Sequence, residues 1–182
     1  MAMTLLLGGV ASGKSRTAVA LATATNRPVT LIATAEALDE EMAARIERHR
    51  RERPVDWVVI EEPLALTVAV GSVDPEATLV LDCLTLWVSN LLGGSPEPGD
   101  DDVIALAAAA AKACAARAGA TVVISNEVGA GIVPMHPLAR RFRDLLGRVN
   151  GTFADQANIV ALMVAGRAVR LSDPLTTLEG AR

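Results

Sequence analysis

The sequence is poor in aromatic residues and has no excess of positive charge. Among its 182 residues are two tryptophans, two phenylalanines and no tyrosine, and the formal net charge is −4 at pH 7. Surfaces that bind nucleic acid rely on a basic face or on aromatic stacking platforms. We therefore expect no nucleic-acid partner, and a small phosphorylated molecule is the more natural ligand.

Cysteines and long apolar runs are also scarce. Cys83 and Cys114 have neither the spacing of a disulfide framework nor that of a metal site, which predicts a reducing, cytoplasmic location. The N-terminus has no cationic stretch followed by an apolar segment, and the run from Leu5 to Leu7 is too short to cross a bilayer. We expect neither export nor a membrane span.

Apolar and helical segments alternate along the chain, which predicts an α/β fold with a mostly parallel sheet flanked by helices. The length suits a single domain over residues 1–182, with residues 168–182 as a loosely held tail and 93–100 as a surface loop. We predict strands at 3–7, 28–33, 57–60, 78–81, 121–125 and 159–164. We predict helices at 15–24, 40–51, 102–118 and 137–149.

The first predicted strand runs directly into a glycine-rich phosphate-binding loop. This loop consists of Gly8, Gly9, Val10, Ala11, Ser12, Gly13, Lys14 and Ser15. Its glycines let backbone N–H groups turn toward phosphate oxygens, and the helix that follows adds the partial positive charge of its N-terminus. Lys14 is expected to reach the outer phosphates, and Ser15 to offer its hydroxyl to Mg²⁺. The loop predicts a P-loop NTPase fold that binds nucleoside triphosphates.

Two carboxylates follow predicted strands and should lie near this loop. Asp82 ends an apolar strand, and ligands of such sheets gather at the carboxyl ends of the strands. Asp82 is therefore a candidate for holding Mg²⁺, either directly or through water. Glu61 also follows a strand and could contact the metal or a nucleotide hydroxyl, whereas a solvated turn is about as plausible for Glu62.

The second informative segment is the basic helix at 40–51. Asp39 can cap it, and Met42 and Ile46 should mark its buried face. His49 lies among arginines 45, 48, 50, 51 and 53. Because nearby positive charge disfavours a further proton, we expect a neutral and therefore nucleophilic imidazole beside arginines that bind phosphate. On the residues alone, a solvated basic helix is an equally good interpretation.

Several segments in order resemble a known family. They are the phosphate loop, Leu31 to Ala35, Asp39 to His49, Leu81 to Trp87, Ser125 to Pro134 and Arg140 to Asn150. Together they resemble the bifunctional adenosylcobinamide kinase/adenosylcobinamide-phosphate guanylyltransferases of cobalamin biosynthesis, over Leu5 to about Gly166. The resemblance implies a fold like the recombinase ATPase core and assembly as a homotrimer.

The resemblance also implies two reactions and a set of site residues. Adenosylcobinamide would be phosphorylated by ATP or GTP, and GMP from GTP would then be joined to adenosylcobinamide phosphate through a guanylyl-histidine. The histidine role would fall on His49, with Lys14 as a second catalytic residue. The nucleotide contacts carried over are Gly8 to Ser15, Ala33, Thr34, Ala35, Arg50, Arg51, Glu52, Arg53, Glu61 and Asp82.

Two other functions would also use a phosphate-binding loop. A P-loop kinase of another small alcohol, without nucleotidyl transfer, would share the loop but would not need His49. A GTP-dependent regulatory switch would be expected to carry an Asn-Lys-x-Asp element, which the sequence lacks.

Overall fold

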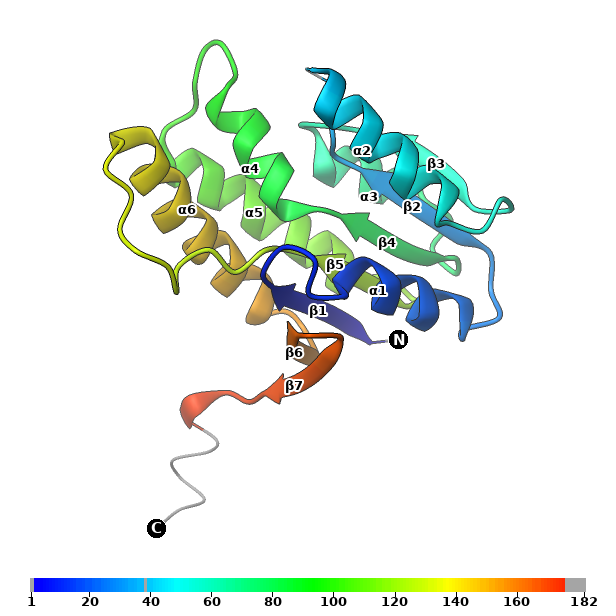
Figure 1. The fold of residues 1–182 in the computed structure, drawn as a ribbon. Coiled ribbons are helices and arrows are strands. Elements are labelled where there is room, and N and C mark those ends of the chain that lie inside the picture. The colour runs from blue at the N-terminus through cyan, green and yellow to red at the C-terminus, as the bar shows by residue number, and fades with distance from the viewer. Residues whose placement is uncertain (1, 38, 176–182) are drawn as a thin grey trace.

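The computed structural model describes residues 2–37 and 39–175, which form seven strands and six helices. The strands are β1 (Met3–Gly8), β2 (Val29–Ala33), β3 (Val58–Glu61), β4 (Thr78–Asp82), β5 (Thr121–Ile124), β6 (Ile159–Val164) and β7 (Arg167–Leu171). The helices are α1 (Lys14–Thr23), α2 (Glu40–Arg51), α3 (Leu66–Ser72), α4 (Leu84–Leu92), α5 (Asp100–Ala115) and α6 (Pro137–Ala154). Figure 1 shows their arrangement.

All seven strands belong to one sheet in the order β3-β2-β4-β5-β1-β6-β7. Every neighbouring pair is parallel except β6 and β7. The central strands are buried on both faces: in β1, Leu6 packs in one hydrophobic cluster, and Leu5 and Leu7 pack in the other. This double burial explains why the strands are continuous apolar runs in the sequence.

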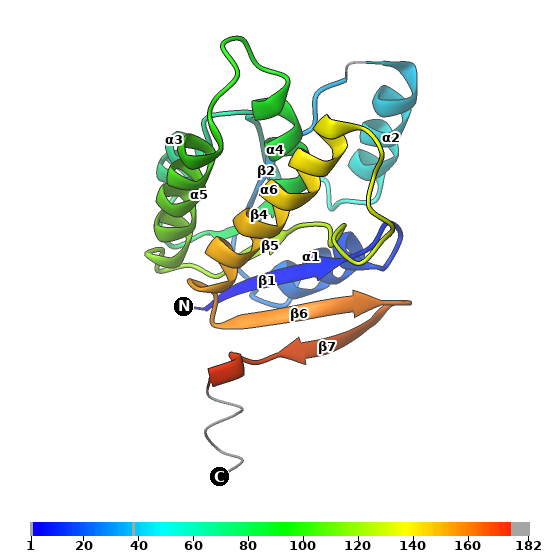
Figure 2. The same ribbon diagram turned by 90° about the vertical axis from the view of Figure 1, so that its left-hand side faces the viewer.

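Helices cover both faces of the sheet and leave the site at one edge. Ala18 and Ala22 of α1 pack against one face, whereas α3, α4, α5 and α6 pack against the other. In Figure 2, α2, the loop after β1 and the loop before α6 lie on the side toward which β1 and β6 point. This is the carboxyl edge, where ligands of parallel sheets bind. None of the helices in the described part of the chain has the length and apolarity needed to cross a membrane.

The six predicted strands are confirmed to within one or two residues, and the prediction of α2 matches its observed bounds. The predicted helix at 102–118 begins earlier and ends at Ala115, and the one predicted at 137–149 continues to Ala154. Helices α3 and α4 were not predicted. α3 is only seven residues long, and most side chains of α4 are buried, so neither has a clear polar face in the sequence.

The tail predicted for residues 168–182 is wrong in its first part, because β7 pairs antiparallel with β6 there. Ala165 and Gly166 connect the two strands with φ values of 50° and 73°, a combination that makes a tight two-residue hairpin turn. All side chains of β7 are exposed, so its sequence lacks a buried apolar pattern. Residues 176–182 lie outside the described residues.

Arg117 is a buried arginine that contacts backbone oxygens of a distant segment. It follows the end of α5 and is 8% exposed. Its guanidinium donates hydrogen bonds to the backbone oxygens of Val70, Val73, Asp74 and Ala77. Burial lowers the pKa of Arg117. The side chain therefore ties the end of α3 and the loop before β4 to α5.

Candidate functional site

The phosphate loop connects β1 to α1, and its first residue packs closely against β6. At Gly8, where φ is 151°, a Cβ would collide with the carbonyl oxygen of Met163 and would lie 2.8 Å from Ser12 Oγ. Lys14 is the first residue of α1 and is 7% exposed. Its Nζ donates hydrogen bonds to the carbonyl oxygens of Gly8 at 2.9 Å and Gly9 at 2.7 Å. The loop thus fixes the ammonium group that is predicted to reach phosphate.

Helix α2 lies over the carboxyl edge without entering the core. Asp39 caps it, as predicted, by accepting a hydrogen bond from the Met42 N–H at 2.7 Å. None of the α2 side chains that the structure describes is fully buried, and Met42 and Ile46 are half-buried. Both line a cavity beneath the helix instead of the hydrophobic core. The apolar face predicted for α2 therefore forms a wall of the site.

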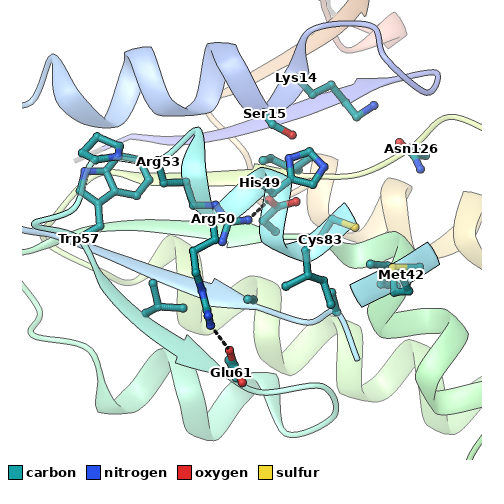
Figure 3. A pocket seen from close by; sticks show the side chains of 18 of the residues that line it. Lys14, Ser15, Met42, His49, Arg50, Arg53, Trp57, Glu61, Cys83 and Asn126 are labelled. Carbon is teal, nitrogen blue, oxygen red and sulfur yellow. Dashed lines mark hydrogen bonds and ion pairs between the residues drawn. The ribbon is translucent and has the colours of Figure 1, made fainter. Parts of the chain in front are cut away.

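This cavity has a volume of about 410 Å³ and is called the main cavity here. It lies among the phosphate loop, α2 and the carboxyl ends of β2, β3, β4 and β5. The imidazole of His49 faces the same space as Lys14 and Ser15 (Figure 3). The predicted site residues that line it are Val10, Lys14, Ser15, Ala33, Ala35, His49, Arg50, Arg53, Glu61 and Asp82.

His49 is accessible to a ligand from more than one direction. Its side chain is 29% exposed, and its Nδ1 lies 3.5 Å from a carboxylate oxygen of Glu52. It also lines a second hollow of about 400 Å³ next to the β6–β7 turn, called the turn-side groove here. The other residues of this groove are Ala11, Gly13, Lys14, Ser15, Arg16, Glu52, Ala165 and Gly166.

Two ion pairs hold the C-terminal part of α2 and the residues after it against the sheet. Arg53 donates to a carboxylate oxygen of Asp82 at 3.0 Å, and both side chains are less than one-fifth exposed. Arg50 donates to Glu61 at 3.2 Å in an exposed pair (Figure 3). These pairs bring the predicted arginines and carboxylates together around the main cavity, which His49 also lines.

Several other predicted nucleotide contacts, among them Thr34, Arg51 and Glu52, do not line the main cavity. The hydroxyl of Thr34 is buried, where it donates to the Cys83 carbonyl at 2.7 Å and accepts from the Cys83 N–H at 2.8 Å. Arg51 points to the outer surface of α2 and pairs with Glu47 at 3.0 Å. The side chain of Arg45 lies outside the described part of the structure.

Other residues of the main cavity, including Asn126 and Cys83, were not predicted from the sequence. Asn126 follows β5, so its place at the carboxyl edge could have been inferred from the sheet pattern. Cys83 follows Asp82, and burial, together with the neighbouring charge of Asp82, raises the pKa of its thiol to about 11. The thiol is therefore protonated at neutral pH.

Comparisons with known proteins identify the family of the chain. A family model described as cobinamide kinase / cobinamide phosphate guanyltransferase matches residues 4–171. The chain belongs to this family. The family and the enzyme class predicted from the sequence, a kinase and nucleotidyltransferase acting on cobinamide, are thereby confirmed.

Curated relatives of this kinase and guanyltransferase family match nearly end to end. The bifunctional adenosylcobalamin biosynthesis protein CobU of Escherichia coli (strain K12) is 42% identical over 180 residues, covering 93% of this chain and 99% of the relative. The corresponding protein CobP of Pseudomonas aeruginosa is 41% identical over 175 residues, covering 94% and 98%.

Solved structures of lower identity share the fold of this family member. The RadB recombinase aligns with a TM-score of 0.53 at 15% identity, covering 88% of this chain and 73% of that chain. An ATPase from a bacterial type III secretion system aligns with a TM-score of 0.55 at 12% identity, covering 98% and 53%. The predicted P-loop NTPase fold with a recombinase-like core is confirmed.

Proposed function

We propose that this chain phosphorylates adenosylcobinamide with ATP or GTP and then joins GMP from GTP to the new phosphate. The observation that carries the proposal is the shared cavity of His49, Lys14 and Ser15. A kinase needs the phosphate loop but no histidine nucleophile. An accessible imidazole beside the loop is the additional group that nucleotidyl transfer requires.

In the nucleotidyl-transfer reaction, His49 is the temporary carrier of GMP. An imidazole nitrogen donates its lone pair to the α-phosphorus, the bond to the β-phosphate oxygen breaks, and that oxygen leaves with the electron pair as pyrophosphate. Glu52 near Nδ1 favours a proton on that nitrogen, so Nε2 is the attacking atom. In the second half, an oxygen of adenosylcobinamide phosphate attacks phosphorus and the N–P electrons return to the ring.

The remaining predicted contacts have separate roles in the main cavity. Arg50 and Arg53 donate hydrogen bonds to phosphate oxygens, which stabilises the charge that develops during attack. Glu61 and Asp82 lie where they can accept hydrogen bonds from nucleoside hydroxyl or N–H groups. Ala33, Thr34 and Ala35 contribute the backbone at the end of β2 and directly after it. In the phosphorylation reaction, Lys14 binds the terminal phosphate that passes to the substrate hydroxyl.

Mg²⁺ fits the residues assigned to it. Ser15 and Asp82 line the same cavity, and Mg²⁺ at phosphate sites commonly takes one or two protein ligands together with phosphate oxygens and water. When bound, the ion reduces the charge repulsion between a polyphosphate and its attacking group. Asp82 accepts a hydrogen bond from Arg53, so the arginine and the ion would share one carboxylate.

We also propose a homotrimer in the cytoplasm. Several large apolar side chains are exposed in the segment before and at the start of α6, among them Ile132 at 97% and Met135 at 96%. Apolar side chains that cluster on one exposed segment favour association between protein surfaces. Two free cysteines suit a reducing compartment.

Product analysis separates this proposal from a kinase without nucleotidyl transfer. Wild-type protein incubated with adenosylcobinamide, GTP and Mg²⁺ should give both adenosylcobinamide phosphate and adenosylcobinamide-GDP by mass spectrometry. The His49→Ala variant should stop at the phosphate. If wild-type protein also stops there, the alternative kinase is correct.

A further inference from the structure

Arg16 is a cation next to the phosphate loop, and the reactions proposed above assign it no role. It follows Ser15 in the first turn of α1, its side chain is exposed, and it lines the turn-side groove. Its guanidinium has no hydrogen-bond or ion-pair partner among residues 2–37 and 39–175. An arginine beside a phosphate loop, with all its donors available, is suited to bind phosphate oxygens.

The position of Arg16 is set by the β6–β7 turn. The Gly166 N–H donates to the Ser12 carbonyl at 2.9 Å, which fastens the turn to the phosphate loop. A Cβ on Gly166 would lie 2.9 Å from Arg16 Nη2, and one on Gly13 would lie 3.9 Å from it. The guanidinium thus rests against a surface without side chains, with its edge open to the groove.

The residues that line both the main cavity and the turn-side groove indicate the path of a bound triphosphate. The main cavity holds the residues proposed to contact the nucleoside and the α-phosphate, namely Arg50, Arg53, Glu61 and Asp82. The turn-side groove contains none of these four. Only Lys14, Ser15 and His49 line both. A nucleotide whose α-phosphate lies at His49 in the main cavity can therefore extend its outer phosphates across Lys14 and Ser15 to the groove that Arg16 lines.

We infer that Arg16 binds the β- and γ-phosphates of GTP and holds the pyrophosphate that leaves when His49 accepts GMP. This inference rests on the proposed guanylyl transfer. As the α-phosphorus bonds to the imidazole nitrogen, the electron pair of the broken bond passes to the β-phosphate oxygen. Arg16 and Lys14 together stabilise the charge that develops on the leaving group.

Pyrophosphate itself is the probe that tests the inference. We expect Arg16→Ala to weaken the binding of magnesium pyrophosphate about 10-fold or more by calorimetry, the usual effect of losing a charge-assisted hydrogen bond. The affinity for GMP should change less than about twofold, because GMP has no outer phosphates. Arg16→Lys should recover only part of the loss, since it keeps the charge without the planar fork.

Arg167→Ala is the matched control, because Arg167 is an exposed arginine directly after the same turn but does not line the turn-side groove. It removes the same charge and should bind pyrophosphate like wild type. Equal pyrophosphate affinity in Arg16→Ala and wild type would overturn the role of Arg16 even if His49 still accepts GMP. Wild-type protein that neither binds pyrophosphate nor labels His49 would overturn the proposed function as well.

Discussion

Arg53 and Asp82 form a shielded ion pair between the segment that follows α2 and the end of β4. The donor and acceptor lie 3.0 Å apart, with side chains 16% and 18% exposed. Arg53 lies four residues after His49, so the pair fixes the distance between the proposed nucleophile and the carboxyl edge of the sheet. The pair couples the position of His49 to the same carboxylate that is proposed to meet the nucleotide and the metal.

The shielded Arg53–Asp82 pair should stabilise the protein more than the exposed Arg50–Glu61 pair. A double-mutant cycle of Arg53→Ala and Asp82→Ala, measured by urea unfolding, should give a coupling free energy of about 1–3 kcal/mol. The same cycle with Arg50→Ala and Glu61→Ala should give about 0–1 kcal/mol, because those side chains are 63% and 66% exposed and are screened by water. Equal coupling in the two cycles would show that the burial of Arg53 and Asp82 has no energetic consequence.

Gly8→Ala should destabilise the phosphate loop. The new Cβ would collide with the Met163 carbonyl and meet Ser12 Oγ, so β1 and β6 must shift apart. We expect a loss of about 1–3 kcal/mol in the free energy of unfolding and weaker binding of GTP. Gly9→Ala is the matched control for stability, because nothing lies within 4 Å of its Cβ position. A Gly8→Ala protein as stable as Gly9→Ala would contradict the close packing of the loop.

The thiol of Cys83 should be unreactive in the folded protein although it lines the main cavity. Burial first, and the charge of Asp82 second, raise its pKa from 9.0 to about 11. In a Cys114→Ala background, alkylation at pH 8 should be at least about 100-fold slower in the native state than in urea. A native rate close to the rate in urea would show that the pKa of the thiol is not raised in the folded protein.

The same shift gives folding stability a definite pH dependence. Because the pKa of Cys83 is higher in the folded state, its contribution is fully present below pH 9 and is lost as the pH rises toward 11. Between pH 9 and pH 11, the free energy of unfolding of Cys83→Ala should therefore fall less than that of the wild-type protein.

The exposed apolar segment should carry self-association. Replacing Ile132 and Met135 together with glutamate should shift the protein toward monomers in analytical ultracentrifugation, because each side chain is more than nine-tenths exposed in the single chain. Replacing Val68 of α3, which is 73% exposed elsewhere, with glutamate should leave the assembly unchanged. An assembly unaffected by the double change would place the interface on another surface.

The sequence predicted those parts of the fold whose local pattern and burial agree. Strands buried on both faces are continuous apolar runs, and α2 has a capping Asp39 with acids in its first turn. Helix α4 lacks a polar face, and β7 has no buried side chain, so neither has the periodicity from which an element is predicted. The C-terminal strand is held by backbone pairing to β6, which the side-chain pattern does not reveal.

The same contrast applies to the site. Lys14, Ser15, His49 and Asp82 could be proposed because their roles depend on residue type and on position after a strand or within a helix. The burial of the Thr34 hydroxyl against Cys83 and the outward direction of Arg51 depend on how segments distant in sequence pack. The approach of Gly166 to Ser12 likewise joins residues more than 150 positions apart, so no local motif could indicate it.

The central claim is that His49 carries GMP during transfer, and labelling tests it most directly. Protein incubated with GTP labelled at the α-phosphate and Mg²⁺ should gain an acid-labile, alkali-stable label on His49 and release pyrophosphate. His136→Ala, which removes the other histidine of the chain, should label like wild type, whereas His49→Ala should not label. Equal labelling of His49→Ala, or no label on the wild-type protein, would contradict the account.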